Sequence, residues 1–71
     1  MPVVHVEMLK GRSGDDKRRL IEEITNVMVD VAGAVRERVT VIVDEVEAEN
    51  WGRGGVPLSD GAGVDGRRGN R

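Results

Sequence analysis

The 71-residue chain contains no cysteine, one histidine, one aromatic residue and two prolines. Without cysteine it cannot form a disulfide or a thiolate metal site. A single histidine also excludes a multi-histidine metal site within one chain. We therefore expect no metal or other cofactor, so any chemistry must come from other side chains or from a terminal group.

Long apolar runs are also missing. No segment approaches the roughly 18 apolar residues of a membrane span, and the N-terminus lacks the basic and apolar regions of a signal peptide. Charged residues make up 34% of the chain, with a formal net charge of −2. The basic end "GRRGNR" has no interleaved aromatics, which argues against nucleic-acid binding. We expect a cytoplasmic protein with neither a membrane nor a nucleic-acid partner.

Two segments have the composition of strands. Residues 3–9, "VVHVEML", and residues 39–46, "VTVIVDEV", are rich in β-branched residues. Alternation assigns side chains to two faces of each strand. In the first strand, one face carries Val4, Val6 and Met8 and the other carries Val3, His5, Glu7 and Leu9. In the second strand, one face carries Val39, Val41 and Val43 and the other carries Thr40, Ile42, Asp44 and Val46.

Between them the period becomes helical over residues 14–32. Ser13 and Asp16 have the spacing of a capping box, and Gly33 is a suitable C-terminal cap. The apolar positions are Leu20, Ile21, Ile24, Val27, Met28, Val31 and Ala32, with Val29 discordant on the polar side. This pattern predicts an amphipathic helix.

Strand, helix and strand in this order predict a right-handed βαβ unit with parallel strands. The segment "NWGRGGVP" predicts turns and a short hairpin, and seven of the ten glycines lie from Gly52 onward. The expected fold is therefore α/β, with a single βαβ unit and a short C-terminal hairpin in a domain over residues 1–58. Residues 59–71 are expected to be a disordered tail.

Both strands carry apolar residues on both faces, which is typical of a sheet covered on two sides. One helix can cover only one of these faces. No other segment of the chain can cover the second, so the sequence predicts self-association.

Pro2 is the main candidate for chemistry, because phosphate loops, paired catalytic carboxylates and nucleophile motifs find no convincing match. Removal of Met1 would leave Pro2 with a free secondary amine, and a terminal amine has a pKa of about 7.7–8.0. Its neutral form could act as a general base or attack a carbonyl. Alternatively, Pro2 only begins a strand.

Its neighbours favour chemistry. Pro2, the first strand, "LKGRS" with Arg12, the helix, the second strand and "EAENWGRGG" together resemble the 4-oxalocrotonate tautomerase family. The resemblance runs from Pro2 to Gly55, about three quarters of the chain. No single motif is specific, but their ordered combination is.

The resemblance implies sheets packed between subunits, commonly in a hexamer. It implies that Pro2 is the base that moves a proton in a small enol or unsaturated keto acid. Arg12 would bind a substrate carboxylate, and Trp51 would stand in the apolar wall near the proline. Such tautomerases often belong to the breakdown of aromatic compounds.

The chain also departs from the family pattern. Thr40 stands where well-studied members offer a second arginine from a neighbouring subunit. Arg38 is expected to share the face of Thr40 and is a candidate substitute, while Arg36 and Arg53 are looser ones. Arg53 also lies where dehalogenating members carry a glutamate, which argues against a hydratase or dehalogenase.

Two hypotheses remain open. The first is a tautomerase that forms a homohexamer and acts on a small carboxylate. The second is a non-catalytic or partner-dependent subunit of a hetero-oligomer, motivated by Thr40. Trp51 could equally be an interface anchor, and His5 is expected to be structural. Glu45 and Glu47 are expected to be solvated or to pair with arginines.

Overall fold

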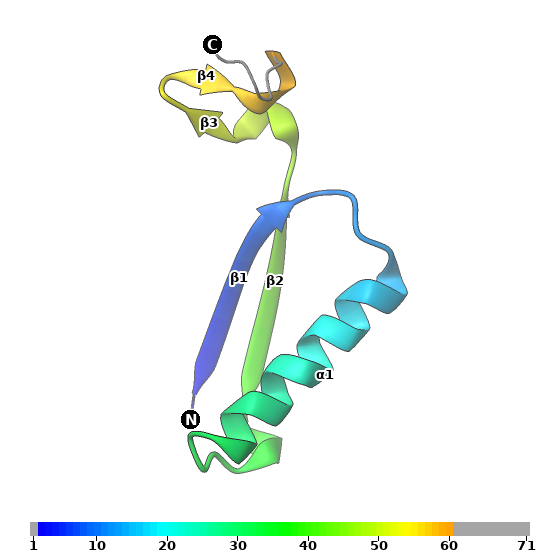
Figure 1. The fold of residues 1–71 in the computed structure, drawn as a ribbon, viewed down its shortest axis with the longest axis vertical. Coiled ribbons are helices and arrows are strands. Elements are labelled where there is room, and N and C mark those ends of the chain that lie inside the picture. The colour runs from blue at the N-terminus through cyan, green and yellow to red at the C-terminus, as the bar shows by residue number, and fades with distance from the viewer. Residues whose placement is uncertain (1, 61–71) are drawn as a thin grey trace.

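The computed structural model describes residues 2–60, which form a βαβ unit followed by a small hairpin (Figure 1). The βαβ unit consists of strand β1 (Val3–Leu9), helix α1 (Gly14–Asp30) and strand β2 (Thr40–Val46). The hairpin consists of β3 (Gly52–Arg53) and β4 (Val56–Pro57), and short 3₁₀ turns occupy Arg36–Arg38, Ala48–Asn50 and Leu58–Asp60. The expected α/β class is thus confirmed.

The two long strands are parallel and in register from Val3↔Thr40 to Leu9↔Val46. The Thr40 backbone N–H donates to the carbonyl of Pro2 at 3.0 Å, so the pairing extends to the residue before β1. The strand β2 begins one residue later than expected. Its predecessor, Val39, ends the preceding 3₁₀ turn by donating to the Arg36 carbonyl at 3.2 Å.

The ends of α1 follow the signals in the sequence. Ser13 is the N-cap, and its Oγ accepts a hydrogen bond from the Asp16 backbone N–H at 3.0 Å. Gly33 adopts a positive φ of 71° and donates to the carbonyl of Val29 at 3.2 Å, which closes the last turn. The helix ends at Asp30, two residues earlier than expected, and its C-cap is Val31 and not Gly33.

The face of α1 that is shielded differs from the one that the sequence predicts, because Val29, expected on the polar side, is half-buried. Leu20, Ile24 and Met28 are half-buried, whereas Val27 is 57% and Val31 82% exposed. A two-stranded sheet is too narrow to cover the whole apolar stripe. Within residues 2–60, no helix combines the length and the apolar character needed to cross a membrane.

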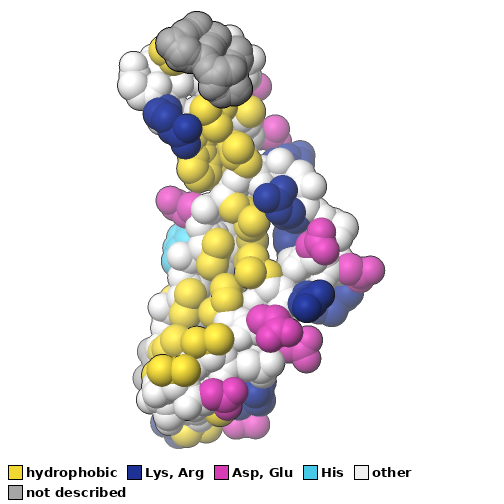
Figure 2. Space-filling model, in the orientation of Figure 1, with side chains coloured by type: hydrophobic (Ala, Val, Ile, Leu, Met, Phe, Trp, Pro, Cys, Tyr) yellow, Lys and Arg dark blue, Asp and Glu magenta, His cyan; other side chains and the backbone are white. Residues whose placement is uncertain are grey.

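The sheet has two unlike faces. The covered face is the one under α1, and its half-buried side chains are Val4, Val6, Met8, Val41, Val43 and Glu45. The open face is the opposite one, formed by Val3, His5, Glu7, Leu9, Thr40, Ile42, Asp44 and Val46. Figure 2 shows the hydrophobic side chains as a band along the molecule, beside the charged surface of the helix.

None of residues 2–60 is buried, and the open face carries exposed apolar side chains such as Val3 (59%) and Ile42 (42%). The radius of gyration is 15.8 Å, whereas a compact chain of this length has about 11 Å. The part of one copy that the structure describes is therefore elongated and lacks a closed core.

The hairpin extends beyond the C-terminal end of β2 (Figure 1). Gly54 and Gly55 have positive φ values of 62° and 86°. A two-residue turn of this kind needs positive φ at both positions, which only glycine adopts readily. The short hairpin expected from "NWGRGGVP" is present, whereas most of the expected tail, residues 61–71, lies outside the described residues.

Candidate active site

The structure separates the candidate site residues into two groups. Pro2, Arg38 and Thr40 lie where β1 and β2 begin, and Arg12 and Trp51 follow the ends of these strands. At about 3.3 Å per residue, a strand of this length keeps the groups roughly 20 Å apart. A single copy therefore does not bring Pro2 and Arg12 together (Figure 1).

At the Pro2 end, Thr40 is the first residue of β2 and its backbone is bonded to Pro2. Arg38 lies in a 3₁₀ turn rather than in the strand, so strand alternation does not place it on the face of Thr40. The guanidinium of Arg36 donates to Asn26 Oδ1 on α1 at 2.7 Å. Arg38 lies closer to Thr40 in the chain than Arg36 does. It also takes no part in the hydrogen bond between Arg36 and Asn26.

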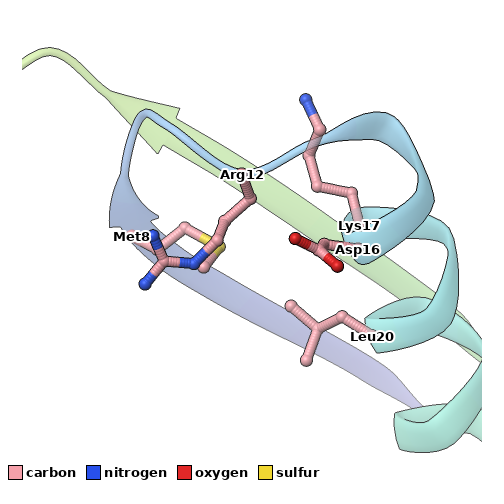
Figure 3. A pocket seen from close by; sticks show the side chains of 5 residues that line it. All are labelled: Met8, Arg12, Asp16, Lys17 and Leu20. Atoms are coloured by element: carbon pink, nitrogen blue, oxygen red, sulfur yellow. The ribbon is translucent and has the colours of Figure 1, made fainter.

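At the other end, Arg12 lies beside a shallow hollow with a volume of about 220 Å³. Met8, Arg12, Asp16, Lys17 and Leu20 line it (Figure 3). Two of these side chains are apolar, and none of the ion pairs formed within residues 2–60 includes Arg12. A free guanidinium beside apolar side chains can bind a carboxylate that carries a hydrocarbon chain.

The segment that carries Arg12, residues 10–13, connects β1 to α1. Gly11 adopts a φ of 140°, a conformation that residues with a side chain rarely take. Lys10 continues the strand pairing, since its backbone N–H donates to the Val46 carbonyl at 2.9 Å. The backbone thus turns sharply just before Arg12.

Two acidic residues at the end of β2 face this segment. Glu45 accepts a hydrogen bond from Lys17 Nζ at 2.7 Å, and Glu47 accepts one from Lys10 Nζ at 3.0 Å. The expected arginine partners are therefore wrong, because the partners are lysines. Lys17, with smaller help from the N–H of Gly11, lowers the pKa of Glu45, and the hydrogen bond to Glu47 raises the pKa of Lys10.

Trp51 follows the 3₁₀ turn Ala48–Asn50 and is half-buried. Its backbone N–H donates to the Ala48 carbonyl at 3.2 Å, and its carbonyl accepts from Leu58 N–H at 2.9 Å. Trp51 is thus fixed at the base of the hairpin. Arg53 lies on β3 at the same end of the molecule and is exposed.

One polar group on the open face was not predicted from the sequence. His5 Nε2 lies 3.6 Å from Asp44 Oδ2, and these two residues and Glu7 offer ligand atoms within 4.8 Å of one another. Strand alternation and the pairing of Glu7 with Asp44 could have revealed it. Exposed carboxylates commonly gather without a metal ion, and this group gives a polar centre to a face whose other residues, apart from Thr40, are apolar.

Comparison with known proteins decides the family. The family model for tautomerase enzymes matches residues 2–61. The chain belongs to the tautomerase family. The family assignment expected from the sequence is confirmed, and it makes this chain a member of a family of isomerases.

Relatives and solved structures of this tautomerase agree. The 2-hydroxymuconate tautomerase of Bacillus subtilis (strain 168) is 37% identical over 60 residues, which cover 84% of this chain and 97% of that protein. The crystal structure of YwhB, a homologue of 4-oxalocrotonate tautomerase, is 34% identical with a TM-score of 0.82, covering 86% of this chain and 100% of its own.

A third neighbour is a heterohexamer 4-oxalocrotonate tautomerase from Chloroflexus aurantiacus J-10-fl. It is 25% identical with a TM-score of 0.78, and the match covers 84% of this chain and 97% of that chain. The fold of this tautomerase is therefore shared by a protein that assembles from unlike subunits.

Proposed function

We propose that this tautomerase uses the secondary amine of Pro2 as a general base to transfer a proton in a small enol or unsaturated keto acid. The observation that carries the proposal is the hollow beside Arg12, where a guanidinium free of ion pairs within residues 2–60 adjoins Met8 and Leu20. This combination suits a carboxylate on a short hydrocarbon chain.

The site is built from more than one copy of the chain. Pro2 comes from one copy, and Arg12 and Trp51 come from another, because they lie at opposite ends of the strands. Self-association is supported by the apolar side chains of the open face and by the absence of any buried residue within residues 2–60. We propose a homohexamer as the functional assembly.

In such a site each group has one role. Arg12 binds and orients the substrate carboxylate through two hydrogen bonds. The amine of Pro2 takes a proton from one substrate position and returns it to another, which interconverts enol and keto forms. Trp51 excludes water, and this keeps the neutral form of the amine accessible. The hydroxyl of Thr40 donates to the substrate carbonyl oxygen.

Thr40 weakens one part of this site. A hydroxyl donates a hydrogen bond to a developing enolate but supplies no positive charge, which is worth several kcal/mol in a dry site. Arg38 of a neighbouring copy is the first candidate to supply that charge, with Arg36 and Arg53 behind it. Turnover of a dicarboxylate is therefore expected to be slow.

Thr40 also favours a second candidate function, a subunit that depends on a different chain for the missing charge. The heterohexameric neighbour shows that this fold accommodates such an assembly. In that case the purified chain alone would be inactive, and addition of the partner chain would restore turnover.

The proposal is tested by ketonisation of 2-hydroxymuconate and of phenylenolpyruvate, followed by ultraviolet absorbance. Replacing Pro2 with alanine should lower kcat about 10²- to 10⁴-fold, the range typical of general acid–base catalysis. Intact mass must show that Met1 has been removed, since Pro2 is otherwise an amide. Equally slow wild-type and Pro2→Ala proteins would exclude catalysis by the chain alone.

The shared site has its own test. Pro2→Ala and Arg12→Ala chains are unfolded together in equal amounts and refolded. Sites that draw these residues from different copies should regain about a quarter of the wild-type activity, because random mixing restores that share of sites. No recovery in a mixed assembly of normal size would show that both residues come from the same copy.

A further inference from the structure

Glu45 of β2 contacts the backbone next to Arg12. Glu45 lies on the covered face, where its side chain is only 19% exposed. One carboxylate oxygen accepts from Lys17 Nζ at 2.7 Å, and the other accepts from the Gly11 backbone N–H at 3.4 Å. Glu45 therefore joins β2 to both the Arg12 segment and the first part of α1.

The two ends of the Arg12 segment are held by other bonds, from Lys10 N–H to the Val46 carbonyl at 2.9 Å and from Asp16 N–H to Ser13 Oγ at 3.0 Å. Gly11, with its φ of 140°, has nothing within 4 Å of the position that a Cβ would occupy. Arg12 itself is exposed, and the ion pair between Lys10 and Glu47 lies on the surface. Glu45 is less exposed than these side chains, and it contacts Gly11, the residue directly before Arg12.

We propose that Glu45 is a positioning residue, which ties the Arg12 segment to β2 and so presents the guanidinium to a substrate carboxylate in one orientation. This inference rests on the proposed role of Arg12 in binding a carboxylate. Glu45 itself does not touch the substrate, because its two oxygens are directed to Lys17 and Gly11.

Glu45 also determines which cation of the hollow is available. Lys17 lines the same hollow as Arg12, but its amine is paired with Glu45 and points away from the guanidinium (Figure 3). An ammonium is a point charge on a flexible stem, whereas a guanidinium offers a rigid fork. The Lys17–Glu45 pair thus leaves Arg12 as the group that selects the ligand's orientation.

The test uses Glu45→Gln in the full chain, with adipate as an unreactive dicarboxylate probe. Binding is measured by calorimetry, and exchange of the Gly11 and Arg12 amide protons is measured by NMR. We expect about tenfold weaker adipate binding, the size of one lost charge-assisted hydrogen bond, together with faster amide exchange in this segment. Glu22→Gln on the exposed surface of α1 is the charge-matched control and should change neither.

A second variant keeps the inference testable if Glu45→Gln does not fold. Lys17→Met removes the partner of Glu45 but leaves the contact with Gly11, so it should weaken adipate binding by a smaller factor of about three. Circular dichroism checks both proteins. If Glu45→Gln does not fold, the Lys17→Met protein is used in its place. The inference is then overturned if Lys17→Met binds adipate as tightly as Glu22→Gln does.

The outcomes separate this inference from the proposed function. If wild type shows no turnover that depends on Pro2, but Glu45→Gln weakens binding and speeds exchange, then only the proposed function fails. If Glu45→Gln matches Glu22→Gln in either measurement, the positioning role is overturned even when the enzyme is active. Adipate binding that does not depend on Arg12, or no binding at all, overturns it as well.

Discussion

The two faces of the β1–β2 sheet differ in both cover and chemistry. The covered face is apolar along β1, where Val4, Val6 and Met8 lie under α1. The open face has apolar residues near both ends of its strands and the polar group of His5, Glu7 and Asp44 between them. Among residues 2–60, cover is thus supplied on one side of the sheet only.

This difference shows how a short chain divides its stability between folding and association. The covered face specifies the βαβ unit, because the helix must lie on it. No residue between 2 and 60 covers the open face, and its polar centre restricts how a second surface can fit, since buried charges need partners. A partner must match apolar ends and a polar middle.

The largest effect on stability is expected from a charge introduced into the covered face. Val43→Asp places an unpaired charge beneath α1 and should destabilise the protein by about 3 kcal/mol. Urea unfolding followed by circular dichroism measures this loss. Val43→Thr replaces one methyl group with an uncharged hydroxyl of similar size. It should lower the free energy of unfolding by clearly less.

A smaller effect is expected from the same substitution one residue earlier, on the open face. At concentrations high enough for assembly, Ile42→Asp should keep the helical signal, but it should weaken self-association by at least about tenfold, because a charge then enters the contact surface. Sedimentation velocity over a range of concentrations measures the assembly. An unchanged assembly size would show that the open face is not the contact surface.

The smallest effect concerns the one ionisable side chain that β2 places on the covered face. The pKa of Glu45 is lowered from 4.5 in the folded protein, mainly by Lys17. A group with a lowered pKa contributes stability that is complete above its ordinary pKa and is lost as the pH falls through the folded value. The difference in unfolding free energy between wild type and Glu45→Gln should therefore shrink below about pH 4.5.

The Glu22→Gln protein serves as the comparison in that titration. Its difference from wild type should stay small at every pH, because Glu22 is exposed on α1 and takes part in no ion pair within residues 2–60. A Glu45→Gln difference that does not change with pH would show that the charge of Glu45 does not contribute.

Much of the fold could be predicted from the sequence because each element carries a local signal. The period of two gave both strands, the capping pattern at Ser13 gave the start of α1, and the two glycines gave the hairpin turn. The errors lie where tertiary context decides. Val31 matches the helical period but extends past the narrow sheet, and Arg38 belongs to a 3₁₀ turn that no pattern announced.

The candidate site could be predicted only as a set of residues. Family resemblance selected Pro2 and Arg12, but it did not place them in one copy or in two. The rise per residue of β1 already implied the separation, since the strand lies between them. The role of Glu45 was missed because its contacts with Lys17 and Gly11 join segments far apart in the chain.

The absence of any buried residue within residues 2–60 has a consequence for anyone handling this protein. If the copies shield one another, dilution separates and unfolds them, because the folded fraction depends on total protein concentration by mass action. Specific activity is then expected to fall at low concentration and to recover when the protein is concentrated again. In a cell, the rate of synthesis would set not only how much enzyme is present but also what fraction of it is folded.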